Sequence, residues 1–242
     1  MKLLLTIIVI LEFCACSEVS REELPDLEGE WMYTKETANI SGDDVGLKFE
    51  DDTVYVIRNS GLWQEGKYTL KQGEVDVVGF GGIKTKYFIL NHLPDTLKIS
   101  RGNHVEKLYS RRLEYNPNLK FDKIIFNAGG CYGECPEFIM TLYGDGDVNF
   151  EGTTNTKSLG NTKFKVETRA LQTIDSLFKW SYIDSLDATK DYGAVDGWDM
   201  EITFYYTENR VKTINGTSME MPFRLKKIIR WLTDEARKKD LI

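Results

Sequence analysis

The sequence has few of the residues and patterns that mark common enzyme classes. It contains only two histidines, His92 and His104, and no recognisable third zinc ligand accompanies them. It has no P-loop, no dinucleotide fingerprint and no nucleophile elbow. Its net charge of −7 argues against the basic face that a nucleic-acid partner requires. We therefore expect no nucleic acid and no cofactor, and we favour a non-catalytic role over a catalytic one.

The sequence also lacks an apolar run long enough to cross a membrane. Its apolar run, Leu3–Leu11, falls short of the roughly 20 residues that a bilayer requires. The composition is 41% hydrophobic and 29% charged, which is typical of a folded protein rather than a disordered one. At 242 residues, the chain has room for one or two domains.

The N-terminus has the layout of an export signal. Lys2 supplies a positive charge, Leu3–Leu11 forms the apolar region, and Ala15 is a small residue at the expected cleavage site. Cys16 follows that site directly, and the arrangement resembles the lipobox of bacterial lipoproteins. The resemblance implies removal of residues 1–15 and attachment of a diacylglyceryl group to Cys16, which would hold the protein at a membrane.

Other interpretations of this segment stay open. Cys14 is an alternative acceptor, because Leu11 lies three residues before it, although bulky Phe13 would then occupy the cleavage site. An ordinary cleaved secretory signal and a retained apolar N-terminus are the remaining alternatives.

Residues 16–26 form an acidic tether. It resembles the surface-export signals of lipoproteins from Bacteroides-like bacteria, and a plain solvated linker is the alternative. We expect an exported protein that is lipid-anchored in the cell envelope of a Gram-negative bacterium. The outer membrane is the expected location, and the face on which the protein lies stays open.

Residues 27–113 show the pattern of an all-β domain. Short alternating segments such as Gly66–Leu70 and Thr96–Ile99 recur every 8–12 residues between turn clusters, which predicts seven or eight strands in a sandwich or barrel. The motifs Gly29-x-Trp31, Gly66-Lys67-Tyr68 and Asp95–Ile99 resemble those of lipocalin-like lipoprotein domains. The resemblance implies a small barrel with Trp31 closing one end. A small apolar ligand in this barrel would be lined by Trp31, Trp63, Tyr68 and Phe88.

A second domain is predicted at residues 119–242, after the turn signal Asn116-Pro117. Strand-like segments alternate with two helical ones, which indicates an α+β domain with an antiparallel sheet. One helix follows Glu167, with Leu171, Ile174, Leu177 and Phe178 on one face. The other begins near Pro222 and has an apolar side and a basic side. We expect its apolar side to be Leu225, Ile228, Ile229, Leu232 and Ala236, and its solvated side to include Arg224, Lys226, Lys227, Arg230, Arg237, Lys238 and Lys239.

Cys131 and Cys135 are the sharpest local feature of this second domain. Gly133 lets the chain fold back so that the two thiols can meet, and an oxidising compartment favours a structural disulfide. A redox-active pair, a copper site and free thiols are the alternatives. The motif Cys-x-Gly-x-Cys-Pro, with Gly144-Asp145-Gly146 after it, resembles an uncharacterised bacterial lipoprotein domain, domain of unknown function 6438. The resemblance covers roughly residues 120–240 and implies no catalytic residue.

An acidic stretch follows the first of the two helical segments. It contains Asp187, Asp191, Asp196 and Asp199, but its spacing does not fit a calcium-binding loop. We therefore expect a solvated loop, with a calcium site as the alternative.

These observations predict a mixed fold, with an N-terminal all-β lipocalin-like small barrel and a C-terminal α+β domain with an antiparallel sheet and two helices. The expected function is that of a membrane-anchored envelope lipoprotein that binds or interacts without catalysis, its partner being an unknown envelope protein. One alternative is a carrier of a small apolar ligand in the barrel. A second alternative is a thiol–disulfide oxidoreductase that uses Cys131 and Cys135.

Overall fold

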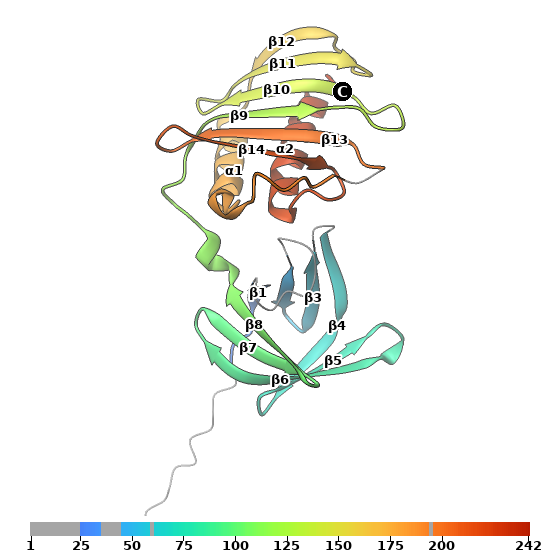
Figure 1. Ribbon diagram of the computed structural model, residues 1–242, viewed down its shortest axis with the longest axis vertical. Coiled ribbons are helices and arrows are strands. Elements are labelled where there is room, and N and C mark those ends of the chain that lie inside the picture. Colours follow the sequence, from blue (N-terminus) through green and yellow to red (C-terminus); the bar gives the residue numbers. More distant parts are fainter. Residues whose placement is uncertain (1–24, 35–44, 59–60, 194–195) are drawn as a thin grey trace, which may run out of the picture.

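The structure is a computed structural model, and it describes residues 25–34, 45–58, 61–193 and 196–242. Two β structures follow one another along the chain, and they lie in the lower and upper halves of Figure 1. The predicted acceptor cysteines Cys14 and Cys16, and the signal around them, lie outside the described residues.

The first structure is a closed antiparallel barrel of eight strands, in which each strand pairs with the next and β1 pairs with β8. Side chains alternate across its wall, as the sequence pattern predicts: Leu97 and Ile99 are buried, whereas Thr96 and Lys98 are exposed. The prediction of a small β-barrel is therefore confirmed. Its strands are β1 (Gly29–Tyr33), β2 (Gly46–Glu50), β3 (Thr53–Arg58), β4 (Gly61–Lys71), β5 (Glu74–Gly79), β6 (Lys84–Leu93), β7 (Thr96–Arg101) and β8 (His104–Ser110).

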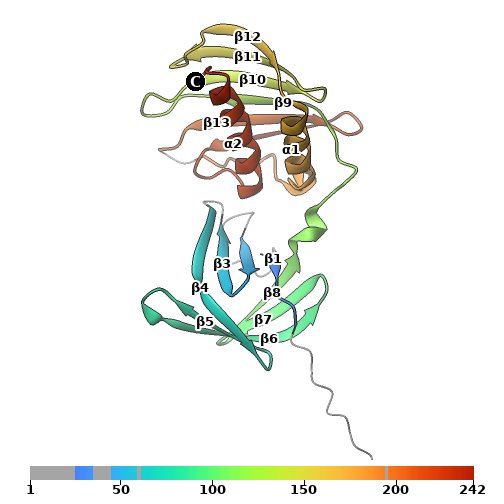
Figure 2. The same cartoon turned by 180° about the vertical axis from the view of Figure 1, so that it is seen from behind.

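The second structure is a six-stranded antiparallel sheet with the order β12-β11-β10-β9-β13-β14. Gly144–Gly146 forms the turn of the hairpin between β10 and β11, and Gly146 has a φ of 90°, which suits a residue without a Cβ. Figures 1 and 2 show both helices on one face of the sheet. Its elements are β9 (Phe121–Ala128), β10 (Glu137–Tyr143), β11 (Asp147–Thr154), β12 (Gly160–Lys165), α1 (Thr168–Lys179), β13 (Asp199–Tyr206), β14 (Arg210–Thr217) and α2 (Phe223–Lys238).

The apolar faces of both helices pack on the sheet as predicted. Ile174 and Phe178 of α1 are buried, and Phe178 stacks on Phe204 of β13 at 5.4 Å between ring centroids. The whole predicted apolar side of α2 is buried. The barrel has a separate hydrophobic core, so each structure buries its own apolar surface.

One predicted position on α2 is wrong. Arg224 was expected on the solvated side, but only 4% of it is exposed. It lies four residues before buried Ile228, on the edge of the apolar stripe, where α2 approaches the barrel. Its burial is explained by a partner on the segment that leaves the barrel.

That segment runs from residue 111 to residue 120 and begins with the short helix η2 (Arg111–Glu114). It connects β8 to β9 (Figure 2). The ring centroid of Tyr115 lies 4.9 Å from that of Trp180, and the backbone N–H of Asn116 donates a hydrogen bond to the backbone carbonyl of Lys179 at 3.0 Å. The segment is therefore packed against the end of α1 rather than extended through solvent.

Candidate functional site

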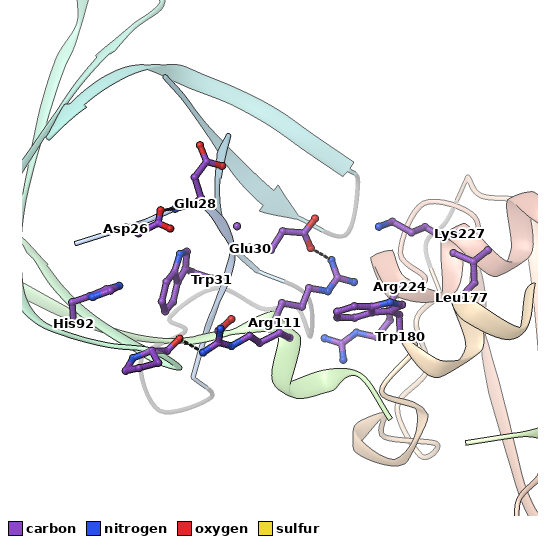
Figure 3. A pocket seen from close by; sticks show the side chains of 14 residues that line it. Asp26, Glu28, Glu30, Trp31, His92, Arg111, Leu177, Trp180, Arg224 and Lys227 are labelled. Atoms are coloured by element: carbon purple, nitrogen blue, oxygen red, sulfur yellow. Dashed lines mark hydrogen bonds and ion pairs between the residues drawn. The ribbon is translucent and has the colours of Figure 1, made fainter. Parts of the chain in front are cut away.

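A pocket of about 580 Å³ lies between one end of the barrel and the helices of the second sheet. Both structures and the segment between them line it (Figure 3). A volume of this size is typical of small-molecule sites. We call it the barrel–helix pocket, and its principal residues are Glu30 and Trp31 from β1, Arg111 from η2, Trp180 at the end of α1, and Arg224 and Lys227 from α2.

Trp31 forms the barrel side of this pocket. It is buried, and its indole Nε1 donates a hydrogen bond to the Leu27 carbonyl at 2.8 Å, which fixes the ring over the end of the barrel. The His92 ring lies 5.7 Å away and also lines the pocket. His92 Nε2 is buried, and it has no hydrogen-bond partner among the described residues.

A buried carboxylate, that of Glu114, pairs with two arginines that line the pocket. Its Oε2 lies 3.2 Å from Arg111 Nε, and its Oε1 lies 3.3 Å from Arg224 Nη2. Tyr109 donates its hydroxyl hydrogen to Oε1 at 2.7 Å. Arg111 also pairs with Glu30 on β1. One carboxylate thus joins an arginine from η2 to an arginine from α2, and we call these residues the Glu114 cluster.

The charged groups of this cluster are buried and stabilise one another. The side chains of Glu114, Arg111 and Arg224 are nearly inaccessible to water, so each charge depends on its partners for solvation. Burial, followed by the negative charge of Glu114, raises the pKa of Tyr109 above its ordinary value. At neutral pH Tyr109 is therefore a neutral hydrogen-bond donor to Glu114.

Arg112 and Trp180 complete two walls of the barrel–helix pocket. Arg112 Nε lies 2.6 Å from Asp95 Oδ1, and its Nη2 donates to the Pro94 carbonyl at 2.6 Å. These contacts hold the guanidinium against the β6–β7 turn. Trp180 caps the C-terminal end of α1 and packs against Tyr115, with the two rings tilted at 44° to each other. The pocket therefore combines fixed arginines with aromatic surfaces.

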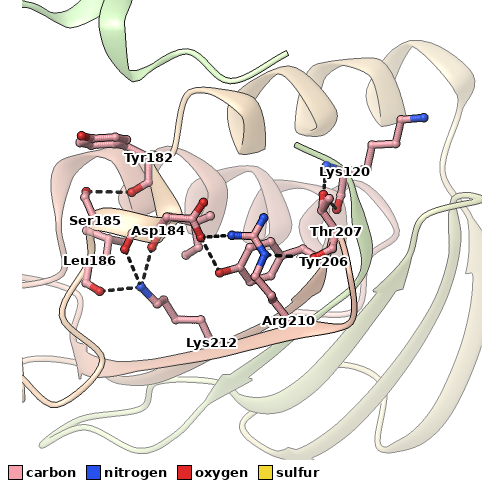
Figure 4. A network of polar contacts seen from close by, with 10 residues as sticks. Lys120, Tyr182, Asp184, Ser185, Leu186, Tyr206, Thr207, Arg210 and Lys212 are labelled. Atoms are coloured by element: carbon pink, nitrogen blue, oxygen red, sulfur yellow. Dashed lines mark hydrogen bonds and ion pairs between the residues drawn. The ribbon is translucent and has the colours of Figure 1, made fainter. Parts of the chain in front are cut away.

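A second polar network, shown in Figure 4, joins β14 to the segment that follows α1. Lys212 Nζ donates to the carbonyls of Ile183, Asp184 and Leu186 at 2.9, 3.1 and 2.7 Å, and burial lowers its pKa. Burial, followed by the hydrogen bond to Asp184, raises the pKa of Tyr206 to about 12. Lys212, Tyr206 and Arg210 all donate to acceptors between residues 183 and 186, which indicates that the network holds the loop after α1 in place.

Cys131 and Cys135 lie at bonding distance in the loop between β9 and β10. Their sulfurs are 2.03 Å apart and their Cα atoms 5.8 Å apart. Between them Tyr132 is 88% exposed. Trp198 anchors the base of the loop, since its Nε1 donates to the Gly129 carbonyl at 2.8 Å. The pair therefore closes a small loop on the surface of the sheet.

The four residues predicted to line a ligand site in the barrel are only partly brought together. Trp31 belongs to the barrel core, and partly buried Tyr68 packs against that core, edge-on to Phe49 at 5.1 Å between ring centroids. Trp63 is 59% exposed and Phe88 is 41% exposed, so neither joins that core. Their apolar character suggested burial, but the alternation of β6 buries Tyr87 and exposes Phe88.

The acidic stretch after α1 is divided between separate environments. Asp187 Oδ1 accepts from the amide and the hydroxyl of Thr189, whereas Asp191 and Asp199 line a polar pocket of about 510 Å³. Within the described ranges, no three histidine, cysteine, aspartate or glutamate side chains form a group that could hold a metal ion. Likewise, none of the helices in the described part of the chain is long and apolar enough to cross a membrane.

The Glu114 cluster is the feature that sequence reasoning missed. Glu114 and Arg224 are far apart along the chain, and each alone resembles an ordinary surface charge. One signal was present: Arg224 lies a helical turn before Ile228, in phase with the apolar stripe of α2. A charge at such a position needs a partner, although the sequence does not name it.

Comparisons with known proteins identify one part of the chain. No curated protein and no solved structure matches the chain. Residues 122–236 match the family model described as domain of unknown function (DUF6438), which covers most of the second sheet and both helices and confirms the predicted resemblance for this part of the chain.

Proposed function

We propose that this protein is a non-catalytic binding module of the bacterial cell envelope that takes a small ligand in the barrel–helix pocket. In this proposal a lipid on Cys16 anchors it to the outer membrane of a Gram-negative bacterium. The export-signal pattern around Cys16 supports the anchor. The pocket supports the binding role, because it is the size of a small-molecule site and is lined by both β structures.

The proposal includes a division into two domains. Residues 27–113 would form a lipocalin-like domain, and residues 119–242 would form the domain that contains the DUF6438 match. Two separate hydrophobic cores support this division. Pockets at the junction of two domains are common ligand sites, since each domain contributes a rigid wall.

The observation that carries the proposal is the fixed position of the charged groups around the pocket. Arg111 and Arg224 are held by Glu114, and Arg112 is held by Asp95. Side chains that are already ordered lose little conformational freedom when a ligand binds, which favours affinity. Arginine keeps its proton throughout the physiological range, so these groups suit recognition of a charged ligand better than proton transfer.

A blocking substitution tests this function. Lys227 is an exposed residue of α2 that lines the pocket, so Lys227→Trp would fill the pocket without removing core contacts. Arg230→Trp, at an exposed position of α2 outside this pocket, is the matched control. Each protein is incubated with the low-molecular-mass fraction of a bacterial envelope extract and examined by native mass spectrometry.

We expect a bound species with the wild-type chain and with Arg230→Trp, and its loss with Lys227→Trp. A bound species that survives Lys227→Trp would place the ligand elsewhere. A wild-type chain that binds nothing from the extract would contradict the proposed function.

A further inference from the structure

The charges that line the barrel–helix pocket are unevenly distributed. Asp26 and Glu28 lie on the barrel side, and Arg224 and Lys227 lie on the helix side (Figure 3). Trp31 lies between the two ends, together with the paired side chains of Glu30 and Arg111 (Figure 3). Trp180 and Leu177 lie on the helix side, beside the cations. The pocket therefore has an acidic end, a basic end with the apolar surface of Trp180 beside it, and a middle in which Trp31 lies next to two charges that already offset each other.

The acidic end carries two carboxylates without cationic partners. Both side chains are exposed, and neither forms an ion pair with any described residue. Asp26 Oδ1 accepts a hydrogen bond from the Glu28 amide at 2.9 Å, which positions the first carboxylate. After burial, the charges of Glu28 and Asp26 are the next largest causes that raise the pKa of Tyr68. Their negative potential therefore reaches the end of the barrel.

The basic end contains the guanidinium group of Arg224 and the ammonium group of Lys227, whose Nζ lies 5.0 Å from the centre of the Phe223 ring. Glu114 holds Arg224 in place, and Lys227 lies three residues further along α2 at an exposed position. The N-terminal end of α2 adds to this positive potential, since the first turn contains no acidic residue. An anionic group entering from the open side of the pocket would meet these cations.

No ligand of a single charge type fits both ends. A purely anionic ligand would meet the carboxylates of Asp26 and Glu28, and a purely cationic ligand would meet Arg224 and Lys227. A purely apolar ligand would cover charged groups without replacing their contacts with water, which is unfavourable. A zwitterion with an apolar body between its charges satisfies all three parts of the lining.

We propose that the barrel–helix pocket binds a short peptide with charged termini and an apolar side chain. This inference rests on the proposed function of the pocket as a binding site. The ammonium group of the peptide lies at Asp26 and Glu28, its carboxylate lies towards Lys227 and Arg224, and its apolar side chain contacts Trp31 and Trp180.

Three related probes test this inference by isothermal titration calorimetry with the full chain. Alanyl-phenylalanine carries both charges, its N-acetyl derivative lacks the cation, and its C-terminal amide lacks the anion. Each charge-assisted contact that is lost weakens binding by about tenfold to a hundredfold. We expect the free dipeptide to bind, and both blocked forms to bind at least tenfold more weakly. Glycerophosphoethanolamine, a fourth probe, presents the same two charges from a lipid headgroup without an apolar side chain.

Variants assign the ends of the ligand. The double substitution Asp26→Asn with Glu28→Gln keeps the shapes of the side chains and removes both charges, and Glu151→Gln on β11 is a control exposed carboxylate outside the pocket. We expect the double variant to lose affinity for the free dipeptide and to change little towards the N-acetyl form. The control variant should bind like the wild type.

Several outcomes overturn the inference. Equal binding of the free and blocked dipeptides, or tighter binding of glycerophosphoethanolamine, would exclude the proposed peptide. Absence of dipeptide binding by a chain that still captures a ligand from envelope extract, sensitive to Lys227→Trp, would refute the peptide and leave the proposed function standing. Failure of both experiments would refute the two together.

Discussion

At the scale of single residues, Glu114 joins parts of the molecule that are distant in sequence. Its carboxylate pairs with arginines on η2 and on α2, and it accepts a hydrogen bond from Tyr109. Removing one member of a buried charge group is costly, because the remaining charges lose their solvation. The shape of the barrel–helix pocket therefore depends on one side chain.

Glu114→Gln tests this dependence. The amide keeps an acceptor for Tyr109 but leaves Arg111 and Arg224 without their shared countercharge. We expect the free energy of unfolding to fall by about 3 kcal/mol. Urea denaturation measures the change, and the exposed substitution Glu151→Gln should alter stability by less than about 0.5 kcal/mol. Equal stability of the two variants would show that the Glu114 cluster contributes nothing.

Cys16 is the second residue on which the account depends. If it carries the lipid, Cys16→Ser should abolish the acyl mass and move the protein from the detergent phase to the aqueous phase on phase separation. Cys14→Ser is the matched control, since that residue would be removed with the signal. A lipid that is lost in Cys14→Ser and kept in Cys16→Ser would assign the anchor to Cys14.

At the scale of elements, strands and helices could be predicted because their signals are local. The alternation in segments such as Thr96–Ile99 predicted the barrel strands, and the repeat of Leu225, Ile228 and Leu232 predicted the buried face of α2. The prediction of a ligand site went wrong where it relied on the apolar character of single residues instead of on this alternation. Trp63 and Phe88 lie outside the barrel core, although the apolar character of their side chains suggested burial.

The loop between β9 and β10 provides a test at the element scale. Closing so short a loop with a disulfide contributes about 2 kcal/mol in the chain-entropy treatment. Replacement of both Cys131 and Cys135 by serine should therefore lower the unfolding free energy by about that amount and leave ligand binding unchanged, as measured by urea denaturation and calorimetry. A thiol–disulfide exchange activity that disappears in this variant would instead support the redox alternative.

At the scale of the whole molecule, the pocket could not be predicted from the sequence. Its lining comes from β1, the β6–β7 turn, η2, α1 and α2, and it exists only because residues 111–120 bring the barrel against the two helices. The charges that line it looked like ordinary surface residues in the sequence. Tertiary pairing, through Glu114 above all, converts them into fixed groups.

The dependence of stability on alkaline pH tests the burial of Tyr109 beside Glu114. The raised pKa of Tyr109 means that the folded state keeps a proton that the unfolded state releases above about pH 10. Stability should therefore be fully present below pH 10 and should fall as pH rises further, by up to about 1.4 kcal/mol per pH unit for this group. Tyr109→Phe should show a shallower decline in denaturation experiments at several pH values. Identical pH profiles would show that Tyr109 is not buried beside a charge.

Hydrogen exchange tests the central claim most directly. The full chain is compared with and without the low-molecular-mass fraction of envelope extract, and protection is measured along the sequence. We predict that the ligand slows amide exchange in two regions that are distant in sequence. One surrounds Trp31 on the barrel, and the other comprises the residues around Trp180 and around Lys227 on the helix side. Protection confined to one of these regions, or absent from both, would contradict a site shared between the barrel and the helices.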